Sequence, residues 1–111
     1  MKEPKYLDQA FEQVCEELKE MFIKKHKDYG KGNIVDTAEL GIAFRISDKL
    51  NRLKHLFAKN KDPENEGIEE TWIDIATYAV IAVLFRRSWF KRLELKESAN
   101  KKKASKKSPA C

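Results

Sequence analysis

The sequence predicts an all-α fold: a helical bundle with three main helices in each chain, completed by self-association. Apolar residues recur at helical spacing in three segments that account for most of residues 1–95. No segment alternates apolar and polar residues with the period of two that a half-buried strand requires. The 111 residues suffice for one domain. A chain of this size buries only about two thirds of the surface that its unfolded form exposes, so a partner subunit would add burial.

The first predicted helix runs from about Pro4 to Lys27. Pro4 suits the first helical turn, because proline lacks the N–H that this turn leaves unpaired. The helix is expected to end at the stretch Asp28 to Asn33, where two glycines and an asparagine stop it. Its apolar face has steps of four, three, four and three residues and consists of Leu7, Phe11, Val14, Leu18 and Met21.

The second predicted helix runs from about Thr37 to Lys59, with Asp36 or Thr37 as its N-cap. A polar connection, residues 60–67, contains Pro63 and separates this helix from the next. The apolar seam of the second helix is formed by Ala43, Ile46, Leu50, Leu53 and Phe57.

The third predicted helix begins between Glu64 and Glu69 and runs at least to Arg87, with Glu97 as its furthest end. From Trp72 to Phe85, apolar residues occupy almost every face of this helix. A helix that is apolar all round must be covered all round. Two short helices of the same chain cannot do this, so we expect a homo-oligomer, either a dimer or a tetramer.

The net charge of +5 is confined to one end of the sequence. Residues 96–111 contain six Lys and one Glu and lack apolar periodicity, whereas residues 1–95 contain equal numbers of acidic and basic residues. We therefore predict a domain over residues 1–95 and a disordered Lys-rich tail over residues 96–111. The tail either solubilises the protein or makes a weak contact with nucleic-acid phosphates.

Composition favours a cytoplasmic protein without a membrane partner. The longest apolar stretch, Ile75 to Phe85, is shorter than the ~20 residues that cross a bilayer. The first residues lead into no apolar signal region. Cys15 and Cys111 form neither a disulfide framework nor a metal knuckle.

Carboxylates on the third helix are the first candidates for chemistry. Glu66, Glu70 and Asp74 are spaced by four residues, so they rise along one side of the helix on successive turns. Like charges in such a row repel one another, and a divalent cation would relieve the repulsion. Oxygen ligands without His or Cys suit a hard ion, Mg²⁺ or Mn²⁺. Alternatively, Glu66, Glu69 and Glu70 only complement the dipole at the start of the helix.

A second stripe of charge follows the second helix. Arg45, Asp48, Lys49 and Arg52 lie on one flank of it. One interpretation is a ladder of intrahelical ion pairs on a solvated face. The other is that Asp48 adds a carboxylate to the metal site while the three cations bind substrate phosphates.

The loop after the first helix has the composition of a nucleotide-binding loop. Tyr29 is a candidate for stacking on a base, and Lys25 or Lys31 for binding phosphate. Asp28 and Asn33 add a carboxylate and an amide. The glycine spacing is not that of a Walker loop. The two histidines, His26 and His55, follow no ligand spacing and are expected on the surface.

Three blocks of these residues resemble the nucleotide modification associated domain family, which is frequent in phage genomes. The blocks are Lys25-x-x-Asp28-Tyr29-Gly30, then Arg45-Ile46-Ser47-Asp48-Lys49-Leu50-x-Arg52-Leu53, and then Glu66-x-Ile68-Glu69-Glu70-Thr71-x-x-Asp74-Ile75-Ala76-x-Tyr78-Ala79-Val80. The family in turn resembles the all-α, MazG-like superfamily of NTP pyrophosphohydrolases. The resemblance implies an oligomeric helical bundle that uses Mg²⁺ to hydrolyse a nucleoside triphosphate to the monophosphate and pyrophosphate.

The resulting hypothesis is Mg²⁺-dependent hydrolysis of a nucleoside triphosphate, in the first place a deoxynucleoside triphosphate. Glu70, Asp74 and Asp48 would hold Mg²⁺ or Mn²⁺, and Glu66 or Glu69 would act as general base. Substrate would be bound by Lys25, Asp28, Tyr29, Lys31, Asn33, Arg45, Lys49 and Arg52. The alternative is a protein that binds nucleotides without catalysis, for sequestering or sensing. Asn51 and Thr71 favour it, because they stand where the superfamily carries further carboxylates. A third hypothesis is a structural, self-associating protein whose tail contacts nucleic acid.

Overall fold

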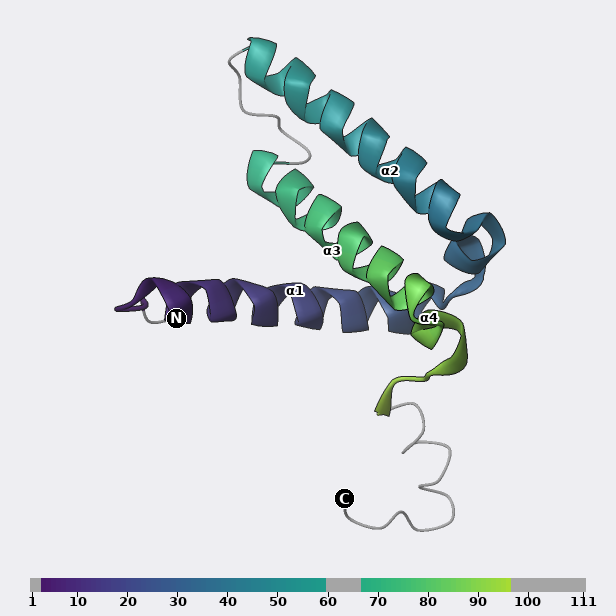
Figure 1. Cartoon of the computed structure of the whole chain (residues 1–111). Coiled ribbons are helices and arrows are strands. Elements are labelled where there is room, and N and C mark those ends of the chain that lie inside the picture. The colour runs from purple at the N-terminus through teal and green to yellow at the C-terminus, as the bar shows by residue number, and fades with distance from the viewer. Residues whose placement is uncertain (1–2, 60–66, 97–111) are drawn as a thin grey trace.

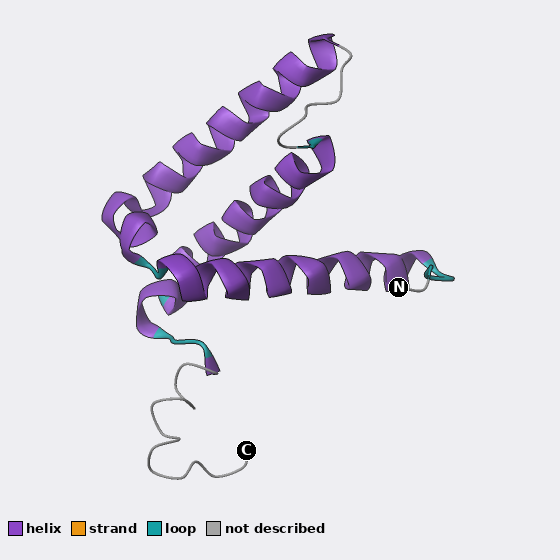
Figure 2. Cartoon of the chain, turned by 180° about the vertical axis from the view of Figure 1, so that it is seen from behind, coloured by secondary structure: helices purple, strands orange, loops and turns teal. Residues whose placement is uncertain are grey.

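The computed structural model describes residues 3–59 and 67–96, except for the side chain of Asn33. All regular structure within these ranges is helical: α1 (Leu7–Tyr29), α2 (Gly32–Lys59), α3 (Ile68–Arg86) and the short α4 (Trp89–Arg92). Figure 1 shows α2 and α3 side by side, with the C-terminal end of α1 beside the α3–α4 end. The view from behind in Figure 2 shows the same arrangement. The prediction of an all-α fold with three main helices is confirmed.

Helix α1 begins three residues later than expected and ends two residues later. Tyr6, with φ −122° and ψ 152°, is the extended residue before the helix. The placement of Pro4 in the first helical turn is therefore wrong. Gly30 terminates the helix with φ 70°, and its N–H donates to the carbonyl oxygen of His26. Glycine suits this position because its lack of a Cβ permits a positive φ.

Helix α2 begins at Gly32, five residues before the predicted start, and contains a kink. Ala38 has φ 57° and ψ −158°, outside the helical region, so two helical segments meet there. The kink lies one residue after Thr37, where the sequence predicts the N-cap of a single helix. The predicted N-cap therefore lies beside the kink, but the prediction missed both the kink and the short helical segment that precedes it.

Gly41 lies just beyond this kink, and its position leaves no room for a side chain. A Cβ on Gly41 would collide with Cβ and Oγ1 of Thr37. We expect Gly41→Ala to lower the free energy of unfolding by about 1–3 kcal/mol, as forced overpacking does. Urea denaturation measures this loss. The double variant Thr37→Gly/Gly41→Ala is the control, because its loss should be smaller than the sum of the two single losses. Strict additivity would contradict the proposed collision.

Helix α3 begins within the predicted interval, at Ile68. The preceding Gly67 is extended, and its N–H donates to Oε1 of Glu70 at 2.9 Å. The Thr71 side chain is fully buried and donates from Oγ1 to the carbonyl oxygen of Gly67 at 3.0 Å. These bonds satisfy polar groups at the helix start, where intrahelical partners are missing.

Helix α3 does not extend to Glu97, the furthest end that the sequence predicts. It ends at Arg86, and Ser88 takes a left-handed conformation with φ 61°. The chain then turns into α4, which places Phe90 in the core with 4% of its surface exposed. The backbone of Arg87 closes α3 by donating to the carbonyl oxygen of Val83 at 3.1 Å.

The core is small and lies where α2, α3 and α4 meet. Its buried cluster consists of Ile42, Ile81 and Phe90. Leu53, also buried, lies farther along α2. The predicted seam of α2 is correct for Leu53 and for the half-buried Ile46 but wrong for Ala43, Leu50 and Phe57, which are exposed. The inward face of α2 is instead formed by Ile42, Arg45, Ile46, Lys49, Leu53 and Leu56.

Much apolar surface is uncovered in the single chain. On α3, Trp72, Val80 and Val83 are exposed, in agreement with the apolar character of all its faces. No helix among the described residues has the combined length and apolar content needed to cross a membrane. Residues 60–66 of the predicted connection, Cys111 and the predicted tail beyond Lys96 lie outside the described residues.

Candidate functional site

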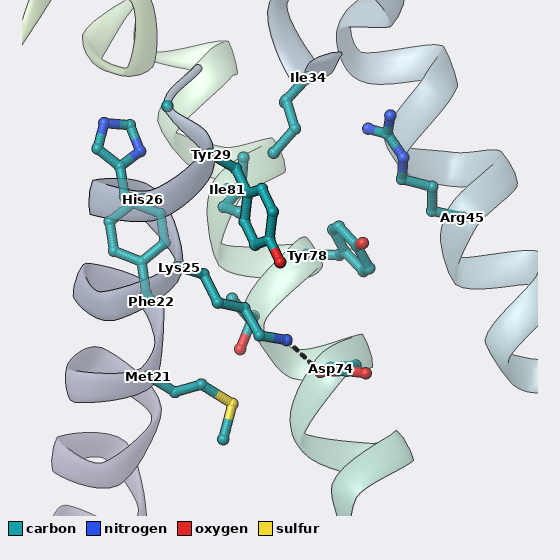
Figure 3. Close-up of a pocket in the computed structure, with 12 residues that line it drawn as sticks. Met21, Phe22, Lys25, His26, Tyr29, Ile34, Arg45, Asp74, Tyr78 and Ile81 are labelled. Atoms are coloured by element: carbon teal, nitrogen blue, oxygen red, sulfur yellow. Dashed lines mark ion pairs between the residues drawn. The ribbon is translucent and has the colours of Figure 1, made fainter. Parts of the chain in front are cut away.

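Asp74 on α3 lies where α1, α2 and α3 approach one another. Only 16% of its side chain is exposed. Its Oδ2 is 3.0 Å from Nζ of Lys49 on α2, and its Oδ1 is 3.5 Å from Nζ of Lys25 on α1. Figure 3 shows the Lys25 side chain directed at this carboxylate. A carboxylate this far removed from water requires compensating charge, which the two ammonium groups supply.

A pocket of about 220 Å³ lies between the C-terminal part of α1, the start of α2 and the middle of α3. Its walls are largely apolar and aromatic, and Figure 3 shows Tyr29 and Tyr78 facing the space between the helices. Among the described residues, Nη1 of Arg45 has no hydrogen-bond partner although it is buried. A buried donor without a partner at a pocket wall is positioned to receive a ligand oxygen. The pocket is lined by Met21, Phe22, Lys25, His26, Tyr29, Gly30, Ile34, Arg45, Asp74, Thr77, Tyr78 and Ile81.

A wider groove of about 750 Å³ adjoins this pocket between α1 and α3. The two spaces share four lining residues: Met21, Lys25, Tyr29 and Asp74. The groove is lined by five carboxylates and only two lysines, so its charge is net negative. Its remaining lining residues are Glu17, Glu20, Lys24, Asp28 and Glu70.

The groove contains no preformed metal cage. Within residues 3–59 and 67–96, no three side chains of His, Cys, Asp or Glu are grouped so that they could hold a metal ion. Asp74 is engaged by lysines, and Glu70 accepts from the backbone of Gly67. Mg²⁺ in nucleotide-dependent proteins is commonly bound by one or two carboxylates together with substrate phosphates. Asp74 and Glu70 both line the groove and stand one helical turn apart on α3.

The stretch of sequence that builds most of this site matches a known family. The profile of the Nucleotide modification associated domain 1 family matches residues 25–85, which is more than half of the chain. The chain belongs to this family. No match was found among curated proteins or among solved structures.

The nucleotide modification associated domain thus runs from Lys25 through α2 and nearly to the end of α3. Both ends of its range contribute to the pocket, because Lys25 opens the range and Ile81 lies near its close. The acidic face of α1, with Glu17 and Glu20, precedes the matched range.

The structure brings together six of the residues that the sequence predicts for the site of this domain. They line the pocket, the groove or both, and they are Lys25, Asp28, Tyr29, Arg45, Glu70 and Asp74. Lys49 joins them through its ion pair with Asp74.

Other predicted site residues are not brought to the pocket or the groove. Asp48 and Glu69 are exposed and belong to neither lining, and Arg52 is half-buried on α2 outside both. Glu66 and the side chain of Asn33 lie outside the described part of the domain.

Lys31 has a structural partner instead of a place in the pocket. Its Nζ donates to the carbonyl oxygens of Lys91 and Leu93 at 3.1 and 2.6 Å. The same nitrogen is 3.2 Å from Oε2 of Glu94. Lys31 therefore links the start of α2 to the end of α4 and to the residues that follow it. The loop composition that suggested a phosphate ligand cannot distinguish these two uses of a lysine.

Sequence reasoning missed several residues of the site. Glu17, Glu20 and Lys24 line the groove, and their spacing of three and four residues is a signal that places them on one face of α1. Phe22 and Tyr78 line the pocket. These aromatic residues carry no such signal, because an aromatic residue at helical spacing is equally typical of a core.

His26 is half-buried and does not lie on the surface as expected, whereas the exposure of His55 is confirmed. The imidazole of His26 lies between two aromatic rings, with ring centroids 5.4 Å from Phe22 and 6.0 Å from Phe90. Burial lowers the pKa of His26 from its ordinary value of 6.5, and the nearby Lys31 lowers it further, against a smaller opposing effect of Glu94.

This shift predicts a loss of stability in mild acid. Because the pKa of His26 is lower in the folded state than in the unfolded state, protonation below about pH 6.5 favours unfolding. We expect the free energy of unfolding to fall between pH 7.5 and about pH 5.5, and His26→Gln to flatten this part of the profile. His55→Gln is the matched control, since His55 is exposed. Urea denaturation at several pH values gives the profiles, and an unchanged slope in His26→Gln would contradict the assignment.

Proposed function

We propose that this domain binds a nucleoside triphosphate together with Mg²⁺ and hydrolyses it to the monophosphate and pyrophosphate. A deoxynucleoside triphosphate is the first candidate substrate. The observation that carries the proposal is the junction at Asp74 of an aromatic pocket and a groove rich in carboxylates. Membership of the nucleotide modification associated domain family supports a nucleotide as ligand.

The pocket is the proposed site for the base and sugar. Phe22, Tyr29 and Tyr78 provide aromatic surface for the base, as in other largely apolar ligand sites. The guanidinium of Arg45 provides a buried donor for a base or sugar oxygen. A space of about 220 Å³ falls below the ~300–1,000 Å³ of typical ligand sites, so the phosphates would extend into the adjoining groove.

The charge of the groove supports binding of the nucleotide with its cation. A bare triphosphate would be repelled by the excess of carboxylates along α1 and α3. When bound, Mg²⁺ would neutralise phosphate charge and acidify an attacking water. Asp74 and Glu70 are the proposed protein ligands. Lys25, which is 57% exposed, is positioned to exchange Asp74 for a phosphate oxygen.

General-base catalysis is proposed for a groove carboxylate that does not hold the ion. Glu17 and Glu20 line the groove, whereas Glu69, which the sequence suggests, does not. Either of the two α1 carboxylates would accept the proton of the attacking water.

Binding without hydrolysis is the second candidate function. The observation that favours it is the double ion pair of Asp74 with Lys25 and Lys49, which already satisfies the best-placed metal ligand. In this alternative the domain sequesters or senses nucleotides.

Calorimetry and product analysis with a panel of NTPs and dNTPs, with and without Mg²⁺, test the proposal. We expect pyrophosphate release with Mg²⁺, and roughly tenfold weaker binding in Lys25→Ala, which corresponds to about 1.4 kcal/mol. Lys54→Ala on the exposed face of α2 is the matched control. Tight binding of intact nucleotide without any product would establish the second candidate. If the protein bound none of the nucleotides in the panel, both candidate functions would be contradicted.

Self-association into a dimer or tetramer is also part of the proposal. Trp72, Val80 and Val83 leave an apolar stripe of α3 exposed in the single chain. Apolar stripes of this kind mark interaction surfaces in soluble proteins.

A further inference from the structure

The α1 wall of the groove between α1 and α3 carries carboxylates without a counter-charge. Glu17, Glu20 and Asp28 line the groove from α1, and all three are exposed. Within residues 3–59 and 67–96, none of the three forms an ion pair with a lysine or an arginine. A cleft lined by charges of one sign concentrates ions of the opposite sign. This wall of the groove therefore attracts a cationic ligand.

The shape and the other side chains of the groove suit a lysine-rich peptide. The groove is a hollow of about 750 Å³, which exceeds the space that a single metal ion fills. Met21 and Tyr29 also line it, and both are exposed. The methylene stem of a lysine packs on such apolar surface, and an ammonium group is attracted to the face of an aromatic ring. A lysine-rich segment thus finds partners here for its stems and for its charges.

The sequence itself contains a segment of this chemistry. Residues 97–111 contain five lysines and one glutamate and no large apolar side chain. Residues 1–95 contain equal numbers of acidic and basic residues, so this segment holds nearly all the excess positive charge of the chain. The groove, with five carboxylates and two lysines, has the opposite excess. The two are complementary in charge.

The contacts of Lys31 place the start of this segment near the groove. Nζ of Lys31 donates to the carbonyl oxygen of Leu93 at 2.6 Å and lies 3.2 Å from Oε2 of Glu94. Lys31 follows Tyr29, a lining residue of the groove, by two positions. Figure 1 shows α4 beside the C-terminal end of α1. The chain therefore leaves α4 close to the end of the groove.

The segment is long enough to follow the groove. From Asp28 back to Glu17 the α1 wall extends roughly 17 Å, at 1.5 Å of helix rise per residue. Residues 97–111 span up to about 50 Å when extended. More than half of this length remains for the path from α4 into the groove.

We propose that residues 97–111 dock in the groove between α1 and α3, with their lysines on the α1 carboxylates, as an autoinhibitory segment. The inhibitory role rests on the proposed function, in which phosphates and Mg²⁺ occupy the same groove. A nucleotide with its Mg²⁺ brings a cation of its own to these carboxylates. It therefore competes with the segment and displaces it.

Spin labels on the two native cysteines of the full chain test the docking without any nucleotide. Cys15 is exposed on α1 within one helical turn of Glu17, and Cys111 lies at the far end of the segment. Pulsed electron paramagnetic resonance measures the distance between the labels, in labelled chain diluted with excess unlabelled chain. We expect a narrow distribution of short distances at low salt. It should be lost at 1 M salt, where the Debye length is about 3 Å.

Two double variants of α1 locate the docking surface. Glu17→Gln/Glu20→Gln removes two charges from the groove wall and should abolish the short distances. Glu12→Gln/Glu16→Gln is the matched control, because it makes the same change on the same helix outside the groove lining. Circular dichroism checks that both variants keep their helices. Equal effects of the two double variants, or a broad distribution in the parent chain at low salt, would overturn the docking.

Replacement of all five lysines of residues 97–111 by glutamine tests the inhibitory role. A segment that occupies the groove nine-tenths of the time weakens nucleotide binding by about tenfold, so the variant should bind a nucleoside triphosphate with Mg²⁺ about tenfold more tightly. Adding the same ligand to the labelled parent chain should remove the short distances. A bound nucleotide that left these distances unchanged would overturn the inhibitory role. If no nucleotide bound, the proposed function would fail, while the label distances without nucleotide would still decide the docking.

Discussion

Phe90→Ala is expected to lower the free energy of unfolding by about 3–5 kcal/mol, the cost of deleting a buried aromatic side chain. Phe90 is 4% exposed and stacks on Phe85 with ring centroids 5.0 Å apart. Its ring also meets the edge of His26 on α1. The substitution removes the side chain that joins α4 to both α1 and α3 in a core with few other buried residues. Urea denaturation followed by circular dichroism measures the loss.

Trp89→Ala is the matched control for this experiment. Trp89 is the adjacent aromatic residue of α4, is 38% exposed, and has the Arg87 guanidinium 4.9 Å from its ring centroid. Exposed cation–π contacts contribute about 0.5–1 kcal/mol, so the control should lose much less stability. If both variants lost the same amount, α4 would not be anchored through Phe90.

Helical periodicity predicts the three long helices of this chain. It does not predict the kink within α2 or the turn between α3 and α4. The end of α1 follows from Gly30, and the start of α3 follows from the acidic residues before Trp72. The left-handed residues Ala38 and Ser88 carry no local signal. Their conformations depend on packing between segments distant in sequence, which periodicity does not contain.

The inward face of α2 illustrates the same limit. Periodicity selects the most apolar face of the helix, whereas the observed inward face is shifted by about one residue and includes Arg45 and Lys49. The shift is understandable from Asp74, because its buried carboxylate requires cations from a neighbouring helix. The pattern of a single helix does not include the charges on its neighbours. It therefore cannot show that α2 turns cations inward at the expense of some apolar residues.

The sequence predicts a site residue best where a charged side chain stands among apolar neighbours. Asp74 stands between isoleucines, and the structure places it at the meeting point of three helices. Lys31 and Asp48 have the same residue types as true pocket residues but lie elsewhere. Lys31 contacts the chain at and after α4, and Asp48 lines neither space; composition reveals neither arrangement.

Asp74→Asn is the substitution with the largest expected effect on function. The variant keeps the size of the side chain but removes the negative charge that faces Lys25 and Lys49. Leaving two partly buried ammonium groups without their carboxylate is expected to cost about 1–3 kcal/mol of unfolding free energy. Under the proposed function, turnover with Mg²⁺ falls by at least 100-fold, the scale seen when one electrostatic group of an active site is lost.

The same variant separates the two candidate functions through its effect on binding. Without Mg²⁺, the freed ammonium groups attract phosphate, so Asp74→Asn should bind a nucleotide more tightly than the parent chain, by roughly tenfold or about 1.4 kcal/mol. A hydrolase gains this affinity while losing turnover, whereas a protein that only binds nucleotides gains affinity and has no turnover to lose. Glu69→Gln on the same helix is the control, because Glu69 is exposed and lies outside both the pocket and the groove. Unchanged affinity and unchanged turnover in Asp74→Asn would remove Asp74 from the site, and both candidate functions with it, because the pocket and the groove join at this carboxylate.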